Sequence, residues 1–228
     1  MTVRHDGRVS AKRTRFWHQA RVIGGVVLAG LLVAGAPARA AGPEILVYGD
    51  SLMAGYGLAR AEGFVPQLQA ALDAAGVEAR LINASASGDT TQAGLARLDW
   101  SLGSDPDGVI LGLGANDMLR GVPVATTRAN LQAMLERFKA ENVPVLLAGM
   151  MAQRGLGESY VQAFDALYPD LAARYGAALY PFFLQGVALE PALNQADMLH
   201  PNAEGIALIV KAMLPSVVAF VAGLGEVP

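Results

Sequence analysis

Residues 44–52 read Glu-Ile-Leu-Val-Tyr-Gly-Asp-Ser-Leu, a short apolar run that ends abruptly in a glycine and two polar residues. Four consecutive apolar residues without polar alternation predict a strand that is buried on both faces. Gly49 ends the run, and Asp50 and Ser51 are residue types that commonly cap the start of a helix. The stretch therefore predicts a first strand that turns directly into a helix, which is how many α/β folds begin.

The rest of the chain continues this alternation. Short apolar runs predict further strands at 77–82, 108–111, 143–150 and 177–180. Helical spacing and helix-start signals predict helices at 64–75, 91–102, 123–141 and 160–175, and a last helix from Asn202 that Pro215 bends or breaks. No internal repeat is visible, so we expect one domain with a mostly parallel sheet covered by helices on both faces. Ligands of such sheets bind outside the carboxyl ends of the strands.

The first forty residues have the pattern of an export signal. A basic segment precedes an uncharged apolar run at 22–36, and Ala38-Arg39-Ala40 has the small-x-small spacing that a signal peptidase recognises. The run is shorter than the roughly twenty residues of a membrane-spanning helix, which disfavours an uncleaved anchor. We therefore predict a cleaved signal peptide at 1–40, a single mature domain at 41–228, and a periplasmic or secreted protein.

The predicted mature chain is acidic. The whole chain has 17 basic and 20 acidic residues, and residues 1–40 hold seven and one of these, which leaves 10 against 19. Nucleic acid as a partner is excluded, because phosphate backbones require clustered Lys and Arg. The chain has no cysteine, and therefore neither disulfides nor thiolate metal sites. The apolar stretch 206–224 contains Lys211 and Pro215, so we expect a core-facing helix and no membrane span after signal cleavage.

His200 is the only histidine left after the predicted cleavage, because His5 and His18 lie in residues 1–40. Imidazole has a pKa of about 6.5 and suits proton transfer near neutral pH. Asp197 precedes His200 by three residues, so its carboxylate can reach one ring nitrogen while the other accepts a proton from a serine. With no second histidine and no cysteine to join this pair, we expect no zinc site.

Three loops at the expected carboxyl edge carry the remaining candidates. Ser51 can supply a nucleophilic hydroxyl and a backbone N–H for an oxyanion. Gly88, in the segment 83–90, lets backbone approach a substrate oxygen, and Asn116 can offer its side-chain amide. Each residue also has an ordinary role in capping or turns, so it is their combination that points to hydrolysis by a serine nucleophile.

Residues 112–117, Gly-Leu-Gly-Ala-Asn-Asp, also have part of the pattern of a dinucleotide-binding loop. That motif needs a third glycine where Asp117 stands, and no helix is expected before Pro123. We therefore reject the nucleotide interpretation, and the site is expected to need no cofactor.

Taken together, these segments resemble the SGNH branch of the GDSL hydrolases. The matching positions are Ser51 in Gly-Asp-Ser-Leu, Gly88 in Ser-Gly-Asp-Thr, Asn116 in Gly-Ala-Asn-Asp, and Asp197 with His200 in Asp-Met-Leu-His-Pro. Residues 56–58, 116–121 and 180–183 are similar to the bacterial periplasmic thioesterase, lysophospholipase and arylesterase group. The resemblance spans about residues 44–214. It implies a flavodoxin-like three-layer α/β/α sandwich with a parallel five-stranded sheet in the order 2-1-3-4-5.

The resemblance also implies a serine hydrolase that cleaves carboxylic esters, thioesters or lysophospholipids without a metal or cofactor. Ser51, His200 and Asp197 would form the triad. The oxyanion would be held by the backbone N–H groups of Ser51 and Gly88 and by the Asn116 amide. Asp50 is expected to hold the first turn by hydrogen bonds to nearby backbone, without a direct chemical role.

Substrate contacts are predicted in the loops after the third and fourth strands, at Leu119, Arg154 and Leu156. Two departures from the group concern the pocket. Ala115 replaces a second glycine, and Met198-Leu199 stand where relatives tend to have Gly followed by Ile or Val. Neither removes a catalytic atom, so they bear on substrate preference. Two alternatives stay open: a carbohydrate O-deacetylase with the same triad, and a non-catalytic binding module of flavodoxin-like shape.

Overall fold

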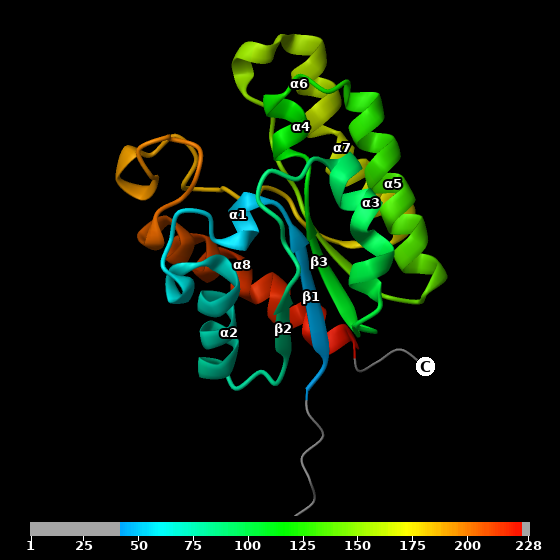
Figure 1. Cartoon of the computed structure of the whole chain (residues 1–228), viewed down its shortest axis with the longest axis vertical. Coiled ribbons are helices and arrows are strands. Elements are labelled where there is room, and N and C mark those ends of the chain that lie inside the picture. Colours follow the sequence, from blue (N-terminus) through cyan, green and yellow to red (C-terminus); the bar gives the residue numbers. More distant parts are fainter. Residues whose placement is uncertain (1–41, 225–228) are drawn as a thin grey trace, which may run out of the picture. The chain divides into compact units, whose positions relative to one another are not determined.

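The structure is a computed structural model that describes residues 42–224, and the predicted signal peptide at 1–40 lies outside the described residues (Figure 1). The strands are β1 Glu44–Gly49, β2 Arg80–Asn83, β3 Gly108–Gly112, β4 Val145–Ala148 and β5 Ala178–Tyr180. The helices are α1 Ser51–Ala54, α2 Phe64–Ala74, α3 Thr91–Leu102, α4 Ala115–Leu119, α5 Val124–Ala140, α6 Glu158–Asp165, α7 Leu167–Tyr175 and α8 Ala203–Leu224. Single 3-10 turns are η1 Arg60–Glu62, η2 Arg154–Leu156 and η3 Pro191–Leu193.

The strands form one parallel sheet in the order β2-β1-β3-β4-β5, which confirms the predicted order. Ile45 of β1 lies between Leu81 of β2 and Gly108 of β3. The chain moves outward to β2 and then returns past β1 to β3, so the strand order reverses beside β1. In open parallel sheets such a reversal opens a crevice at the carboxyl ends of the strands. The loop after β1 is therefore at the position where a ligand is expected.

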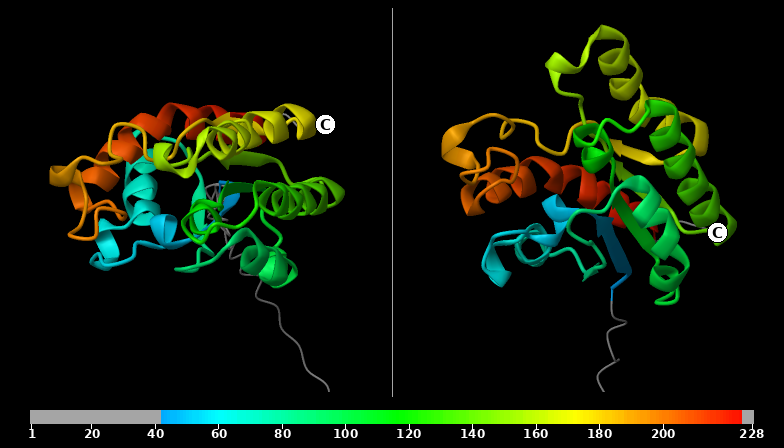
Figure 2. Two further views of the ribbon diagram at one scale, coloured as in Figure 1. Left: turned by 90° about the horizontal axis from the view of Figure 1, so that it is seen from above. Right: turned by 45° about the horizontal axis from the view of Figure 1, so that its top comes forward.

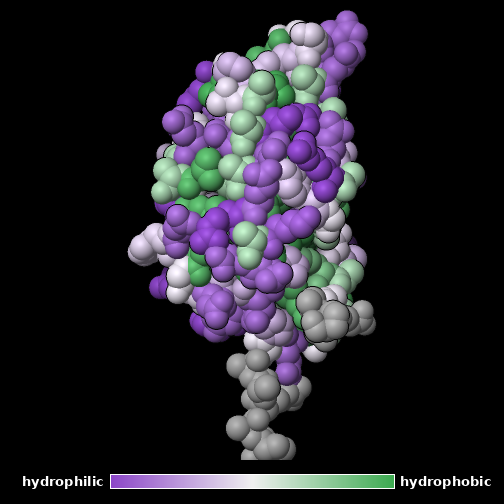
Figure 3. All heavy atoms as spheres, turned by 90° about the vertical axis from the view of Figure 1, so that its right-hand side faces the viewer, coloured by the Kyte–Doolittle hydropathy of each residue, from purple (hydrophilic) through white to green (hydrophobic). Residues whose placement is uncertain are grey.

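Helices cover both faces of the sheet. α2 and α8 pack together on one face, and α3, α5 and α7 lie on the other (Figures 1 and 2). The three layers match the predicted sandwich. Residues 45–48 of β1 are buried, as their unbroken apolar run predicts for a strand covered on both faces. The face turned to the right in Figure 1 is largely hydrophilic, with scattered apolar groups (Figure 3).

α8 is the one helix among the described residues that is long and apolar enough to cross a membrane, judged by length and composition. One side of it, including Ile206, Ile209 and Met213, is buried in the core beside α2, as expected for a core-facing helix. The expectation of a break at Pro215 is wrong, because α8 is continuous to Leu224. Pro215 lies on the exposed side, where the carbonyl of Lys211 that it leaves unpaired can bond to water.

Two further boundaries differ from those expected. The single helix predicted at 160–175 is two helices, α6 and α7, which meet at Ala166. Pro169 in the first turn of α7 has no N–H to donate to the carbonyl of Asp165, so a continuous helix would lose that bond. β2 starts at Arg80 and not at Val77, because its neighbour β1 offers ladder partners only from Glu44 onward.

Candidate active site

Ser51, Asp197 and His200 meet at the carboxyl edge of the sheet. His200 Nε2 lies 2.9 Å from Ser51 Oγ, across 149 residues of sequence. His200 Nδ1 lies 2.7 Å from Asp197 Oδ2 on the other side of the ring. The Asp197 carboxylate also accepts the backbone N–H groups of Leu199, at 2.9 Å, and of His200, at 3.0 Å. The imidazole thus bridges a hydroxyl and a carboxylate.

These bonds keep Asp197 ionised. The backbone N–H groups of His200 and Leu199, followed by the His200 side chain, lower the pKa of Asp197 to about 2. An ionised carboxylate is only an acceptor, so it favours the imidazole tautomer with a proton on Nδ1. Nε2 is then free to accept the proton of Ser51. The ring of Tyr56 lies against the imidazole, with 4.7 Å between ring centroids and a tilt of 40°.

Ser51 is held by the turn at the end of β1. α1 begins at Ser51 itself, and Gly55 ends it after one turn with a φ of 83°. Asp50 is the N-cap and accepts the N–H of Leu52 at 3.0 Å. Ser51 is only 9% exposed, so its hydroxyl is held at the buried start of α1, two residues after the end of β1.

Asp50 makes a second bond that the sequence did not suggest. Its Oδ2 accepts the side-chain amide of Asn116, with 3.3 Å between Nδ2 and Oδ2. The carboxylate is 1% exposed and lines a small cavity with Met53, Met150 and Phe183. Desolvation in these apolar surroundings raises the pKa of Asp50 to about 6, although the bonds from Leu52 and Asn116 act in the opposite direction.

Asn116 lies in α4, and the expectation that no helix starts before Pro123 is therefore wrong. The helix has only five residues, too few for a visible apolar period in the sequence. It begins after Gly114, whose φ is 120° and whose added Cβ would lie 2.3 Å from the hydroxyl oxygen of Tyr168. Asp117 is buried and accepts both the N–H and the hydroxyl of Thr91, which ties α4 to the start of α3.

Gly88 lies in the loop after β2 with a φ of 86°, a conformation that favours glycine. Its carbonyl accepts the guanidinium of Arg120 at 2.8 Å, so the loops after β2 and β3 are bonded to each other. Arg97 pairs with Asp89 at 2.5 Å and also donates to the carbonyls of Ala84 and Gly49.

Arg97 and Arg120 thus fix the loop of Gly88, a candidate oxyanion donor, and neither arginine was expected from the sequence. An arginine that joins distant loops has no signature of its own in the sequence.

The predicted substrate residues lie on the loops after β3 and β4. Leu119 is 47% and Leu156 41% exposed, so both side chains are accessible to a ligand. The two loops touch, because the N–H of Gln153 lies 3.2 Å from Met118 Sδ. Arg154 differs from the two leucines, since its guanidinium is bonded to Asp165 at 2.6 Å. Contact of these three residues with substrate stays a prediction.

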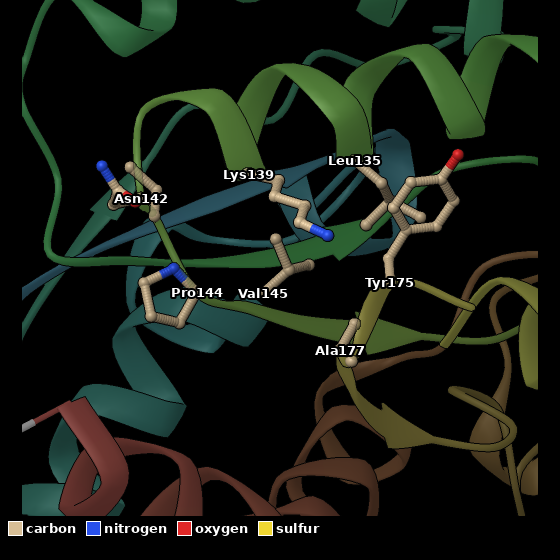
Figure 4. A pocket seen from close by; sticks show the side chains of 9 residues that line it. Leu135, Lys139, Asn142, Pro144, Val145, Tyr175 and Ala177 are labelled. Atoms are coloured by element: carbon tan, nitrogen blue, oxygen red, sulfur yellow. The ribbon is translucent and has the colours of Figure 1, made fainter. Parts of the chain in front are cut away.

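A hollow of about 300 Å³ lies at the opposite edge of the sheet, where β4 and β5 begin. Lys139 and Tyr175 face it from α5 and α7, with apolar residues such as Val145 and Ala177 in its floor (Figure 4). It contains none of the candidate catalytic residues. Among residues 42–224, no three acidic or histidine side chains gather in a group that could hold a metal ion.

Comparisons with known proteins agree on one family. The GDSL-like Lipase/Acylhydrolase family matches residues 47–208. Esterase TesA of Pseudomonas aeruginosa is 42% identical over 164 residues, which cover 72% of this chain and 82% of that protein. Thioesterase 1/protease 1/lysophospholipase L1 of Escherichia coli strain K12 is 39% identical over 166 residues, covering 72% of this chain and 78% of that protein.

A solved structure extends this likeness to the fold. The crystal structure of the psychrotrophic esterase EstA from Pseudoalteromonas sp., inhibited by monoethylphosphonate, superposes with a TM-score of 0.75 at 36% identity. The match covers 79% of this chain and 99% of that chain.

Proposed function

Because the chain belongs to the GDSL-like lipase/acylhydrolase family and is a carboxylic ester hydrolase, we propose that Ser51, His200 and Asp197 are its catalytic triad. The observation that carries the proposal is the imidazole of His200, bonded to Ser51 Oγ at one nitrogen and to Asp197 at the other. A nucleophile, a base and an orienting acid in this arrangement perform acyl transfer on several unrelated folds.

Acylation is the first step of the proposed reaction. His200 Nε2 takes the hydroxyl proton while Ser51 Oγ attacks the acyl carbonyl carbon. The negative oxygen of the tetrahedral intermediate is held by the N–H groups of Ser51 and Gly88 and by the Asn116 amide. His200 then gives the proton to the leaving alcohol or thiol, and the acyl group stays on Ser51.

Deacylation repeats these proton transfers with water as the nucleophile. His200 removes a proton from water, the hydroxide attacks the acyl-serine, and the returning proton restores the Ser51 hydroxyl as the acid departs. Asp197, with its pKa near 2, stays ionised and stabilises the imidazolium in both steps.

The proposed substrates are small acyl esters and thioesters, including lysophospholipids. Relatives named esterase, thioesterase and lysophospholipase support this range. The exposed Leu119 and Leu156 support an acyl chain lying over the loops after β3 and β4, in an open groove. Arg154 is the weakest of the three proposed contacts, because its charge is already paired with Asp165.

Export is part of the proposal. The basic segment, the apolar run and Ala38-Arg39-Ala40 support removal of residues 1–40 and action of residues 41–228 in the periplasm or outside the cell. Expression of the full chain in a bacterium, followed by mass measurement of the purified product, tests the cleavage point. A product that retains residues 1–40 would contradict it.

Hydrolysis of p-nitrophenyl acetate, butyrate, octanoate and palmitate by the purified protein, beside Ser51→Ala, tests the activity. We expect hydrolysis that collapses in the variant, with a chain-length profile that tells short-acyl from long-acyl preference. A folded protein that cleaves none of the esters, or a Ser51→Ala variant with wild-type activity, would refute the proposed mechanism.

A further inference from the structure

Asp50 is a buried carboxylate that the proposed reaction does not use. Oδ1 accepts the N–H of Leu52 and Oδ2 accepts the amide of Asn116, so both oxygens are occupied. Capping α1 does not account for a carboxylate here, because serine or asparagine caps a helix as well. Burying a charged group in apolar surroundings is costly, so a neutral cap would be cheaper. The bond to Asn116 distinguishes aspartate from these neutral caps.

The side-chain amide of Asn116 has a nitrogen and an oxygen, which have opposite effects on an oxyanion. Its nitrogen carries two hydrogens, whereas its oxygen is an acceptor that would repel a negative charge. An ionised carboxylate can only accept hydrogen bonds, so Asp50 favours the orientation in which the amide nitrogen of Asn116, and not its oxygen, faces the carboxylate. One N–H is bonded to Asp50, and the second remains available for the substrate. Without this acceptor, the Asn116 amide could rotate by about 180° about its Cβ–Cγ bond and exchange the positions of its nitrogen and oxygen.

We propose that Asp50 is the positioning residue of Asn116, selecting the amide orientation that presents an N–H to the oxyanion. The inference rests on the proposed function, since it concerns the same site. The bond also strengthens the donor. Hydrogen bonds to an ionised acceptor are stronger than neutral ones, and bonded groups in a buried site polarise one another.

A competing role for Asp50 would be direct action on the imidazolium. The charged or titratable groups that interact with Asp50 are His200, Asp89 and Tyr168, on three different segments. If Asp50 acted on the charge of His200, its effect would be independent of Asn116. The two roles therefore predict different results when both residues are changed.

A double-mutant cycle on the purified, processed protein separates them. Asp50→Asn and Asp50→Ser both keep a cap for the N–H of Leu52, but neither offers a carboxylate to Asn116. We expect each to lower kcat for p-nitrophenyl butyrate about 10- to 100-fold with little change in KM, as expected for a bond to a charged group. In an Asn116→Ala background the same changes should cost less than about threefold, because the amide they orient is gone.

Asp73→Asn is the matched control. Asp73 accepts the side-chain amide of Gln69 at 2.9 Å on the exposed surface of α2, so it is also an aspartate bonded to an amide. Its substitution should leave kcat unchanged. Losses that multiply in the double variants would overturn the inference and assign Asp50 a separate effect. If the wild type shows no hydrolysis that Ser51→Ala abolishes, the proposed function fails instead.

A spectroscopic measurement decides the matter if the Asp50 variants do not fold. The side-chain amide signals of Asn116 in the ¹⁵N-labelled wild type can be assigned by their loss in Asn116→Ala. We expect two well-separated proton signals, one shifted downfield by the carboxylate. Signals at the positions of a freely exposed asparagine would overturn the inference.

Discussion

The two sides of the proposed catalytic site are held in different ways. The Ser51 side, residues 49–52, continues the inner strand β1, and its side chains are buried. The His200 side, residues 194–202, contains no regular helix or strand, and the side chain of Asp197 is 38% exposed. The two carboxylates record this difference: burial raises the pKa of Asp50 to about 6, whereas backbone N–H groups lower that of Asp197 to about 2.

The His200 side is stabilised by hydrogen bonds within the segment and to neighbouring loops, such as the bond from the Gln195 side chain to the carbonyl of Tyr56. The N–H of Gln195 donates to the carbonyl of His200 at 2.8 Å, and Asn194 pairs with Pro201 in a single antiparallel bridge. A substitution in residues 194–202 should therefore lower kcat with little effect on the free energy of unfolding. On the Ser51 side, a change should alter both catalysis and the free energy of unfolding, because the same residues belong to the core. Substitutions on the two sides should therefore differ in whether they change kcat alone or kcat together with the free energy of unfolding.

The largest effect is expected on the His200 side. Asp197→Asn keeps an acceptor for the backbone but presents an amide N–H to His200 Nδ1, which favours the tautomer that cannot accept the proton of Ser51. We expect kcat for p-nitrophenyl butyrate to fall about 10⁴-fold with unchanged folding. Asp170→Asn, at a surface ion pair with Arg128, is the control and should have wild-type kcat. A loss smaller than about tenfold would remove Asp197 from the triad.

The next effect is on the oxyanion. Asn116→Ala removes one proposed donor and should lower kcat by about 10²–10³, as loss of a single oxyanion-hole donor does. It also leaves Asp50 without one of its two partners, so stability should fall as well. Steady-state kinetics and urea unfolding of the same preparation measure both. Unchanged turnover would exclude Asn116 from the oxyanion hole.

Asp50 should make stability depend on pH in the direction opposite to Asp197. Its pKa is raised from 3.8 to about 6 on folding, so between these values the folded state binds a proton that the unfolded state has lost. The free energy of unfolding should therefore decrease as pH rises from about 4 to 6, by about 3 kcal/mol from this group. Asp197, with a lowered pKa, contributes stability that is lost only as pH falls from about 4 towards 2.

Urea unfolding of the wild type and Asp50→Asn from pH 4 to 7 tests this directly. The variant should gain stability relative to the wild type as pH rises through that window, although it is the less active enzyme. If the free energy of unfolding depends on pH in the same way in both proteins, the pKa of Asp50 is not raised by folding.

The smallest effect concerns Met198, which has a φ of 59° on the His200 side. A side chain in this left-handed region costs about 1–2 kcal/mol, and the greater freedom of glycine in the unfolded chain offsets part of the gain from removing it. Met198→Gly should therefore raise the free energy of unfolding by roughly 0.5–1 kcal/mol and change kcat less than about threefold. Leu199→Gly, next to it without a positive φ, should be destabilising. A lower free energy of unfolding in Met198→Gly than in the wild type would show that the positive φ of Met198 does not strain the backbone.

The same contrast explains what the sequence could predict. β1 and the turn to Ser51 follow from an apolar run and a glycine, which are local signals. Asp197 and His200 could be identified because residues 41–228 contain one histidine, with an acid three residues before it. The bond between Asp50 and Asn116 joins residues 66 positions apart and depends on how α1 and α4 pack. The contacts of Arg97 and Arg120 also join residues far apart in the sequence, so no local sequence pattern predicts them.

Covalent capture of the nucleophile tests the proposed catalytic role of Ser51 most directly. The purified protein would be treated with an alkyl fluorophosphonate, and the modified peptide identified by mass spectrometry. We expect one adduct, on Ser51, that is absent in Ser51→Ala and forms far more slowly in Asp197→Asn. A folded protein whose Ser51 stays unmodified, or an adduct on another residue, would contradict it.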